Sequence, residues 1–151
     1  MHEIEYLGEM NVMCKVVILL LYLLLLSIYD IRGLRVPALL LTIGCIGIGI
    51  NAVWELCTGQ QTLLQSMLGV IPGILFLVIA WVSGKAGYAD GIILIWIGIM
   101  CGYRDSFLVL AASLMLASTI SIILLMLRKV NRQSRIPYIP FLAAGLGIVL
   151  L

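Results

Sequence analysis

Long apolar segments separated by short polar stretches are the feature that most limits how this chain can fold. Of its 151 residues, 64% are hydrophobic and 11% are charged, whereas a soluble domain carries about 25% charged residues. The chain therefore lacks the polar groups needed to cover a water-facing surface, and it is predicted to span a membrane several times. Because lipid offers backbone groups no hydrogen-bond partners, and the alternating pattern of a membrane barrel strand is missing, the spans are predicted to be helices.

Charged and turn-forming residues divide the chain into six apolar segments, which predict an all-α bundle of about six transmembrane helices. The segments are 12–29, 36–54, 63–82, 89–103, 106–127 and 136–151. A crossing helix needs about 20 apolar residues. The fourth and sixth segments are shorter than this, and Lys15 interrupts the first. No polar stretch is long enough for a second domain, so residues 1–151 are predicted to form a single membrane domain.

The basic residues predict the orientation of the spans. Seven of the nine lysines and arginines fall in the first, third and fifth loops, namely Arg32, Arg35, Lys85, Arg128, Lys129, Arg132 and Arg135. Basic loops face the cytoplasm, so both termini are predicted to be extracytoplasmic. The start of the chain is acidic and no small-residue cleavage site follows the first apolar segment, so no secretory signal peptide is predicted.

Asp30 and Asp90 are the two acidic residues on the predicted cytoplasmic face, and each stands where a span meets that face. An ionisable residue in such a place is costly and points to function. Two nearby carboxylates can share one proton, so that one activates water while the other polarises a carbonyl. This chemistry hydrolyses a peptide bond without a metal or a covalent intermediate. The pattern predicts a catalytic aspartate pair.

Both aspartates also have structural interpretations. Asp30 can pair with Arg32 or Arg35 in a solvated turn, and Asp90 can serve as the N-cap of the fourth segment, a position that aspartate favours. Spacing alone leaves these alternatives open.

Cofactor and nucleic-acid chemistry are not expected. None of the four cysteines forms a CxxC pair, so no zinc or thioredoxin-type site is predicted, and no metal or cofactor is implied. The few basic residues edge the spans, which argues against nucleic acid as a partner. Two glycine pairs, Gly69 with Gly73 and Gly98 with Gly102, have the four-residue spacing that allows close helix contact.

Three segments together resemble the motifs of the type IV prepilin peptidases. "DIRGLRVP", residues 30–37, resembles that family's Asp-x5-[Ile/Val]-Pro segment, and "GYAD", residues 87–90, resembles its Gly-x-Gly-Asp motif. "RIPYIPFLAAG", residues 135–145, resembles its closing segment, in which a basic residue and Ile-Pro lead into a Pro-Phe helix. The order and spacing of the motifs and their predicted membrane face all agree with the family.

The resemblance implies an intramembrane aspartic endopeptidase whose catalytic pair is Asp30 and Asp90. It implies that the basic leader of a prepilin or pseudopilin is removed at the cytoplasmic face of a bacterial or archaeal cytoplasmic membrane, for assembly of a type IV pilus or secretion system. The implied partners are that substrate and the lipid bilayer, and no oligomeric state is predicted. The motif-supporting residues are Pro37, Gly87, Tyr88, Ala89 and Gly91.

The chain departs from the family pattern at three points. Ala89 stands where the motif has glycine, and alanine can block a backbone of positive φ. Ile92 stands where the family often has lysine. The cytoplasmic domain with paired cysteines is missing, so cleavage without methylation of the new N-terminus is expected, as in the family's short forms.

Two other functions fit the sequence. The chain can be a non-enzymatic membrane scaffold or a small transporter subunit, in which neither carboxylate is needed chemically. A presenilin-like aspartic protease with other membrane substrates is suggested by the Tyr29–Asp30 pair, although that class lacks the Ile/Val-Pro spacing.

Overall fold

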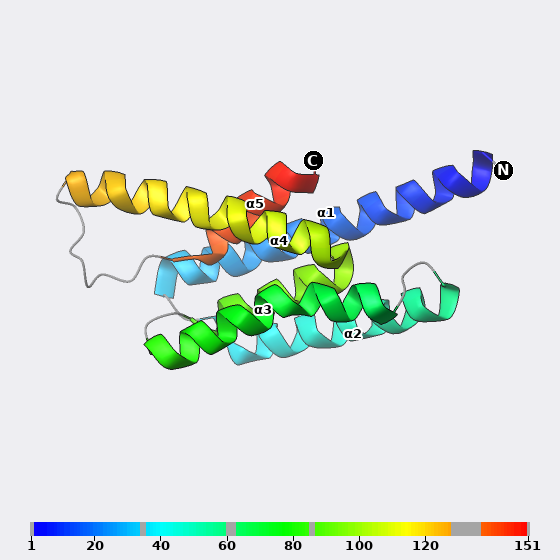
Figure 1. The fold of residues 1–151 in the computed structure, drawn as a ribbon, viewed down its shortest axis with the longest axis horizontal. Coiled ribbons are helices and arrows are strands. Elements are labelled where there is room, and N and C mark those ends of the chain that lie inside the picture. Colours follow the sequence, from blue (N-terminus) through cyan, green and yellow to red (C-terminus); the bar gives the residue numbers. More distant parts are fainter. Residues whose placement is uncertain (1, 34–35, 60–62, 85–86, 128–136, 151) are drawn as a thin grey trace.

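The chain folds into an all-helical bundle in the computed structural model, which describes residues 2–33, 36–59, 63–84, 87–127 and 137–150, with backbone alone for residues 2–12 and 63. No strand occurs among these residues (Figure 1). The helices are α1 (His2–Gly33), α2 (Ala38–Thr58), α3 (Leu63–Ser83), α4 (Tyr88–Met126) and α5 (Ile139–Leu150).

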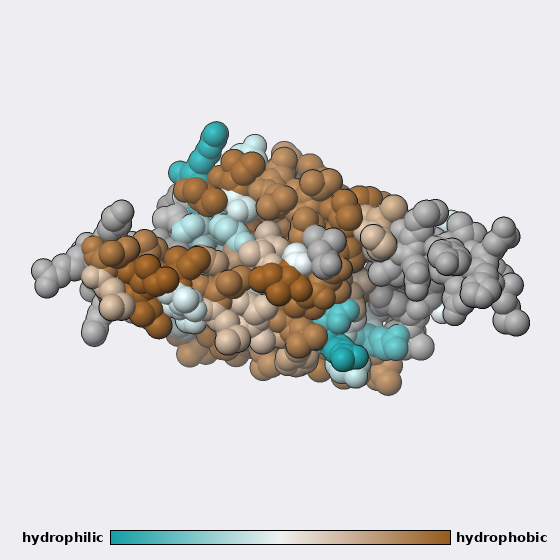
Figure 2. Space-filling model, turned by 90° about the horizontal axis from the view of Figure 1, so that it is seen from above, coloured by the Kyte–Doolittle hydropathy of each residue, from teal (hydrophilic) through white to brown (hydrophobic). Residues whose placement is uncertain are grey.

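Four of the described helices contain a segment long and apolar enough to cross a membrane. These segments are Met13–Gly33, Ala38–Thr58, Leu64–Ser83 and Tyr88–Met126, while α5 is a shorter apolar helix. Large hydrophobic side chains lie exposed on every long helix, and Figure 2 shows hydrophobic residues covering most of the described part of one face. The prediction of an all-α, multi-pass membrane protein is confirmed.

Helix α4 contains a sharp reversal at Gly102. This residue has φ 83° and ψ 178°, a backbone conformation that glycine adopts at little cost and other residues avoid. Figure 1 shows the part of α4 before Gly102 running beside α3, and the part after it running back in the opposite direction. The fourth and fifth predicted segments both lie in α4, one on each side of this reversal.

Glycines bring α3 and the first part of α4 into direct backbone contact. A Cβ added at Gly98 would lie 1.8 Å from the carbonyl oxygen of Gly69, and one added at Gly73 would lie 2.6 Å from the backbone nitrogen of Ile95. The predicted close contact is therefore confirmed for Gly69, Gly73 and Gly98. Gly102 also lies against α3, since a Cβ added at Gly69 would lie 3.2 Å from its backbone carbonyl carbon, although a Cβ added at Gly102 itself would meet nothing within 4 Å.

The first part of α4 is the centre of the bundle. Its residues Ile93, Leu94 and Ile97 are fully buried, and they pack with Leu23 and Leu26 of α1 and with two leucines of α5, Leu142 and Leu146. The start of α4 is thereby fixed against the end of α1 and the start of α5.

Lys15, which interrupts the first predicted segment, is neutralised inside the bundle. Its Nζ lies 2.6 Å from Oε1 of Glu55 in α2, and the Glu55 side chain is only 3% exposed. Pairing offsets part of the cost of carrying two charges in an apolar environment.

Candidate active site

Asp30 and Asp90 come together at one end of the bundle. Asp30 lies in the last turn of α1 and Asp90 in the first turn of α4. Each is only 8% exposed, and the two carboxylates lie close enough for the charge of Asp30 to act on Asp90. Figure 1 shows why, since α1 ends where α4 and α5 begin. The structure thus joins the two aspartates that the sequence singled out.

The carboxylate of Asp30 is held by the start of α5. The backbone N–H of Ile139 donates a hydrogen bond of 3.2 Å to Oδ2 of Asp30. The first N–H groups of a helix have no partner within the helix, and they favour a negative charge nearby. A carboxylate supplied by α1 therefore completes the N-terminus of α5, which fixes Asp30 in place.

Asp90 sits three residues inside α4 rather than at its N-cap, so the N-cap interpretation was wrong. The N-cap is Gly87, with φ −76° and ψ 129°, and the N–H of Asp90 donates to the Gly87 carbonyl at 3.3 Å. The Asp90 carboxylate folds back over Gly87, where an added Cβ would lie 2.8 Å from Oδ2. The glycine leaves the space that the carboxylate occupies.

The remaining predicted residues take different places around Asp90. Gly91 is buried, and a Cβ there would lie 2.6 Å from Cγ of Leu77, so it allows α4 to approach α3. Ala89 has ordinary helical backbone angles, so alanine at this motif position causes no backbone strain. Tyr88 is 56% exposed and points away from the core. Pro37 starts α2, and its carbonyl accepts hydrogen bonds from the N–H groups of Leu40 and Leu41 at 3.0 and 3.3 Å.

Tyr138 is a site residue that sequence analysis missed. It directly precedes Ile139, and its ring lies close enough to Asp90 for that charge to act on it. The Tyr138 hydroxyl lies 2.8 Å from Oγ of Ser113. Ser113 donates its single proton to the Leu110 carbonyl, so Tyr138 is the donor to Ser113. Residues 138–139 therefore lie near both aspartates, with the backbone N–H of Ile139 bonded to Asp30 and the side chain of Tyr138 near Asp90.

Packing of the Tyr138 ring makes this arrangement rigid. The ring stacks on Phe76 of α3, with centroids 5.3 Å apart and an interplanar angle of 14°. One residue thereby connects α3, the second part of α4 and the start of α5. The signal in the sequence was an aromatic residue between two prolines in "IPYIP", whose contacts only the folded chain reveals.

Basic residues do not neutralise this aspartate pair in the part of the chain that the structure describes. Arg32 is exposed, and no ion pair joins it to Asp30. Arg35 and Lys85, the other predicted basic neighbours, lie outside the described residues. Two buried carboxylates that lie close to each other are suited to sharing one proton.

No protein-family model, curated protein or solved structure matches this chain. Its function is therefore inferred from the residues themselves and from their geometry.

Proposed function

We propose that this chain is an intramembrane aspartic endopeptidase of the type IV prepilin peptidase kind, in a short form that cleaves without methylating. It removes the basic leader of a prepilin or pseudopilin at the cytoplasmic face of a bacterial or archaeal cytoplasmic membrane. The observation that carries the proposal is the burial of Asp30 and Asp90 beside each other, from helices sixty residues apart in sequence.

A comparison within the same chain supports a chemical role for this pair. The buried acid Glu55 has a lysine at 2.6 Å, as expected of a structural charge. Among the described residues no basic side chain forms an ion pair with Asp30 or Asp90, and two neighbouring carboxylates raise the free energy of the folded state when both are ionised. Repulsion between buried carboxylates is typical of catalytic sites, whereas the neutralised Glu55 is typical of a structural charge.

The proposed reaction needs one proton on the pair. The ionised aspartate takes a proton from water, whose oxygen attacks the scissile carbonyl carbon, while the protonated aspartate donates its proton to the carbonyl oxygen. The resulting tetrahedral diol collapses when the C–N bond breaks: the aspartate that took the water proton gives it to the leaving amine, and the other aspartate takes a proton from a diol hydroxyl, which restores the pair. The Ile139 N–H fixes Asp30 during these steps, and Gly87 leaves room for Asp90.

A six-span topology with both termini extracytoplasmic accompanies the proposal. A continuous helix of the 39 residues in α4 would be about 58 Å long, twice the thickness of roughly 30 Å of a bilayer core. The reversal at Gly102 supports two crossings in its place. The aspartate pair then lies at the face that the basic loops assign to the cytoplasm.

The test is a cleavage assay in membranes. The chain is co-expressed with prepilin-like candidates from the same genome, and leader removal is followed by mobility shift and N-terminal sequencing. Asp30→Asn and Asp90→Asn are each expected to abolish cleavage at equal expression. Asp105→Asn is the matched control, because this aspartate lies in α4 beyond Gly102, and it is expected to cleave normally.

Each other outcome points to a different function. Cleavage that persists in either variant contradicts the aspartic mechanism. A wild-type chain that cuts none of the candidates favours the non-enzymatic scaffold. A cut inside the hydrophobic segment of the substrate, rather than before it, favours a presenilin-like protease.

A further inference from the structure

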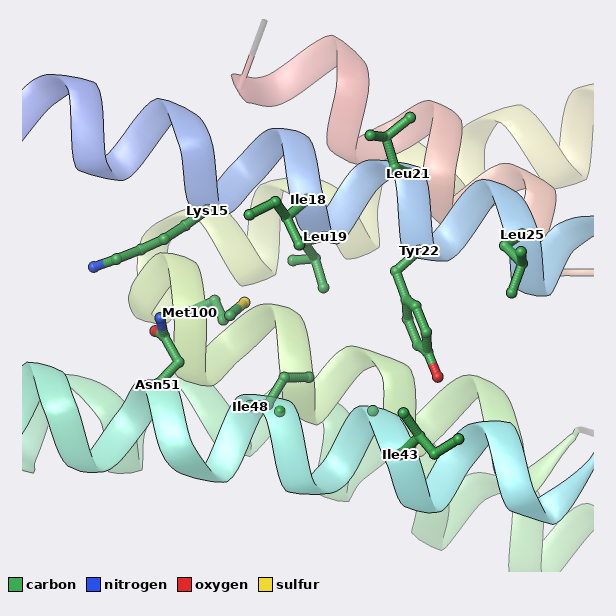
Figure 3. A pocket seen from close by; sticks show the side chains of 12 residues that line it. Lys15, Ile18, Leu19, Leu21, Tyr22, Leu25, Ile43, Ile48, Asn51 and Met100 are labelled. Atoms are coloured by element: carbon green, nitrogen blue, oxygen red, sulfur yellow. The ribbon is translucent and has the colours of Figure 1, made fainter.

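A cavity of about 560 Å³ opens between α1 and α2, away from the aspartate pair. Figure 3 shows side chains of both helices pointing into it, with Met100 of α4 behind. Its floor is apolar and buried, with Leu19 and Ile48 only 3% and 6% exposed. At its rim Ile18 and Ile43 are 65% and 51% exposed, so the cavity opens sideways onto the surface that faces lipid.

Two polar bridges hold α1 and α2 apart around this opening. The first is the ion pair of Lys15 with Glu55, and the second is the hydrogen bond that the Tyr22 hydroxyl donates to the Leu40 carbonyl. Apart from these bridges the two helices hardly approach each other, although they are consecutive in the chain. Lys15 and Tyr22 are seven residues apart, which corresponds to about 10 Å along a helix.

The dimensions of the opening favour an alkyl chain over a helix. A helix is roughly 10–12 Å across with its side chains, and one lying along α1 and α2 would meet both bridges. The α1 residues that line the cavity extend from Lys15 to Leu25, about 15 Å along the helix. This is half of a bilayer core of roughly 30 Å, the depth that one leaflet's acyl chains fill.

One end of the cavity is polar and lies at the level of the lipid headgroups. Lys15 stands two residues inside the membrane segment Met13–Gly33, near the face opposite Asp30. Asn51 of α2 points toward it in Figure 3, and its Oδ1 is buried without a hydrogen-bond partner among the described residues. A buried amide oxygen needs a donor, which the glycerol or amine of a lipid headgroup supplies.

Gly47 keeps the cavity open. It lines the cavity, and a Cβ added there would meet nothing within 4 Å. The first atom of a larger side chain at this position would therefore enter open space.

We propose that one acyl chain of a membrane phospholipid resides in this cavity, with the polar end of the lipid at Asn51 and the Lys15–Glu55 pair. The lipid completes the packing between α1 and α2 that the protein itself leaves open. This site is separate from the proposed peptidase chemistry and does not depend on it.

The test uses a photoreactive lipid. The full chain is reconstituted in phosphatidylethanolamine and phosphatidylglycerol vesicles containing a trace of phosphatidylethanolamine with a diazirine in one acyl chain. After irradiation, labelled peptides are mapped by mass spectrometry for the wild type, Gly47→Leu and Gly49→Leu. Gly49 is the matched control, since its added Cβ also meets nothing within 4 Å and it does not line the cavity.

Label is expected to concentrate on the facing residues of α1 and α2 in the wild type and in Gly49→Leu, and to fall at least tenfold in Gly47→Leu. Equal label in both variants, or label spread evenly over all helices, would mean annular lipid only and overturn the proposal. Loss of wild-type label on adding a transmembrane peptide would assign the cavity to a protein helix and also overturn it.

A second pair of variants protects the test against misfolding. If circular dichroism shows that Gly47→Leu is not folded, Ile18→Trp narrows the same opening from an exposed position of α1. Ile28→Trp is its control, because Ile28 is similarly exposed on α1, at 54%, but does not line the cavity. Label that Ile18→Trp leaves unchanged would refute the proposal.

Discussion

Replacing Gly87 by alanine tests whether the placement of Asp90 matters for catalysis. The backbone of Gly87, at φ −76° and ψ 129°, suits any residue, so the substitution introduces no backbone strain. Its effect comes from the new Cβ alone, which would lie 2.8 Å from Oδ2 of Asp90, 0.6 Å inside the ordinary contact distance of 3.4 Å. The atom that must move is the end of a flexible side chain, so the carboxylate shifts while the helices stay in place.

The expected consequence is a loss of activity with little loss of stability. A misplacement of about 1 Å in a catalytic group costs roughly 100-fold in rate, so a shift of about half that size should lower the cleavage rate about tenfold. The free energy of unfolding should change by less than about 0.5 kcal/mol, as for substitutions that leave packing intact. Both quantities are measurable on purified protein in detergent, with a prepilin peptide and by thermal unfolding.

The control for this variant is Ala89→Gly, which restores the glycine of the resembled motif. Because Ala89 is helical, glycine should lower stability by roughly 0.5–1 kcal/mol and leave the cleavage rate unchanged. The reasoning is refuted if Gly87→Ala cleaves at the wild-type rate, or if Ala89→Gly loses activity while Gly87→Ala does not.

Two further predictions concern the groups around the site and at the opposite end of the bundle. Tyr138→Phe removes the hydroxyl that donates to Ser113 at 2.8 Å and should lower the free energy of unfolding by about 1 kcal/mol. The control Tyr29→Phe, at an exposed tyrosine, should leave this free energy unchanged. Equal effects in the two variants would contradict a stabilising role for the bond to Ser113. Lys15→Met leaves the charge of Glu55 buried and should destabilise the fold by about 3–5 kcal/mol. The double variant with Glu55→Leu should restore stability in the same unfolding assay, and a failure to recover would mean that the pair does more than neutralise charge.

Composition predicted the helical membrane fold. The positions of the helix ends could not be predicted in the same way, because they depend on contacts between helices. The first apolar segment was predicted to end at residue 29, whereas α1 continues to Gly33. Asp30 therefore sits on a helix rather than in a loop, and its carboxylate points at the start of α5. The polar residues "YRD" that follow Gly102 indicated the boundary between the fourth and fifth segments. The chain reverses at Gly102 itself, because glycine accepts backbone angles there that other residues avoid.

The closeness of Asp30 and Asp90 could be predicted because the pattern of basic loops assigns the ends of their two segments to the same side. Tyr138 could not be, because its contacts join three elements that the chain brings together only when folded. The same holds for Lys15, which looked like a defect in an apolar segment until its partner Glu55, forty residues away, was located. The sequence identifies charged residues within apolar segments, but the residues that pair with them are known only from the tertiary structure.

The bundle treats buried acids differently at its two ends, and helix α1 carries part of both arrangements. Lys15 and Asp30 are fifteen residues apart, about 22 Å along the helix, so they belong to opposite ends of the bundle. At the Lys15 end the acid is neutralised and borders a cavity that opens toward lipid. At the Asp30 end the carboxylate accepts a hydrogen bond from the Ile139 N–H, and the charge of the nearby Asp90 adds repulsion. If stability alone were selected, an acid paired with a base would be favoured at both ends. The neighbouring carboxylates of Asp30 and Asp90 therefore support the proposal that the two aspartates share a proton.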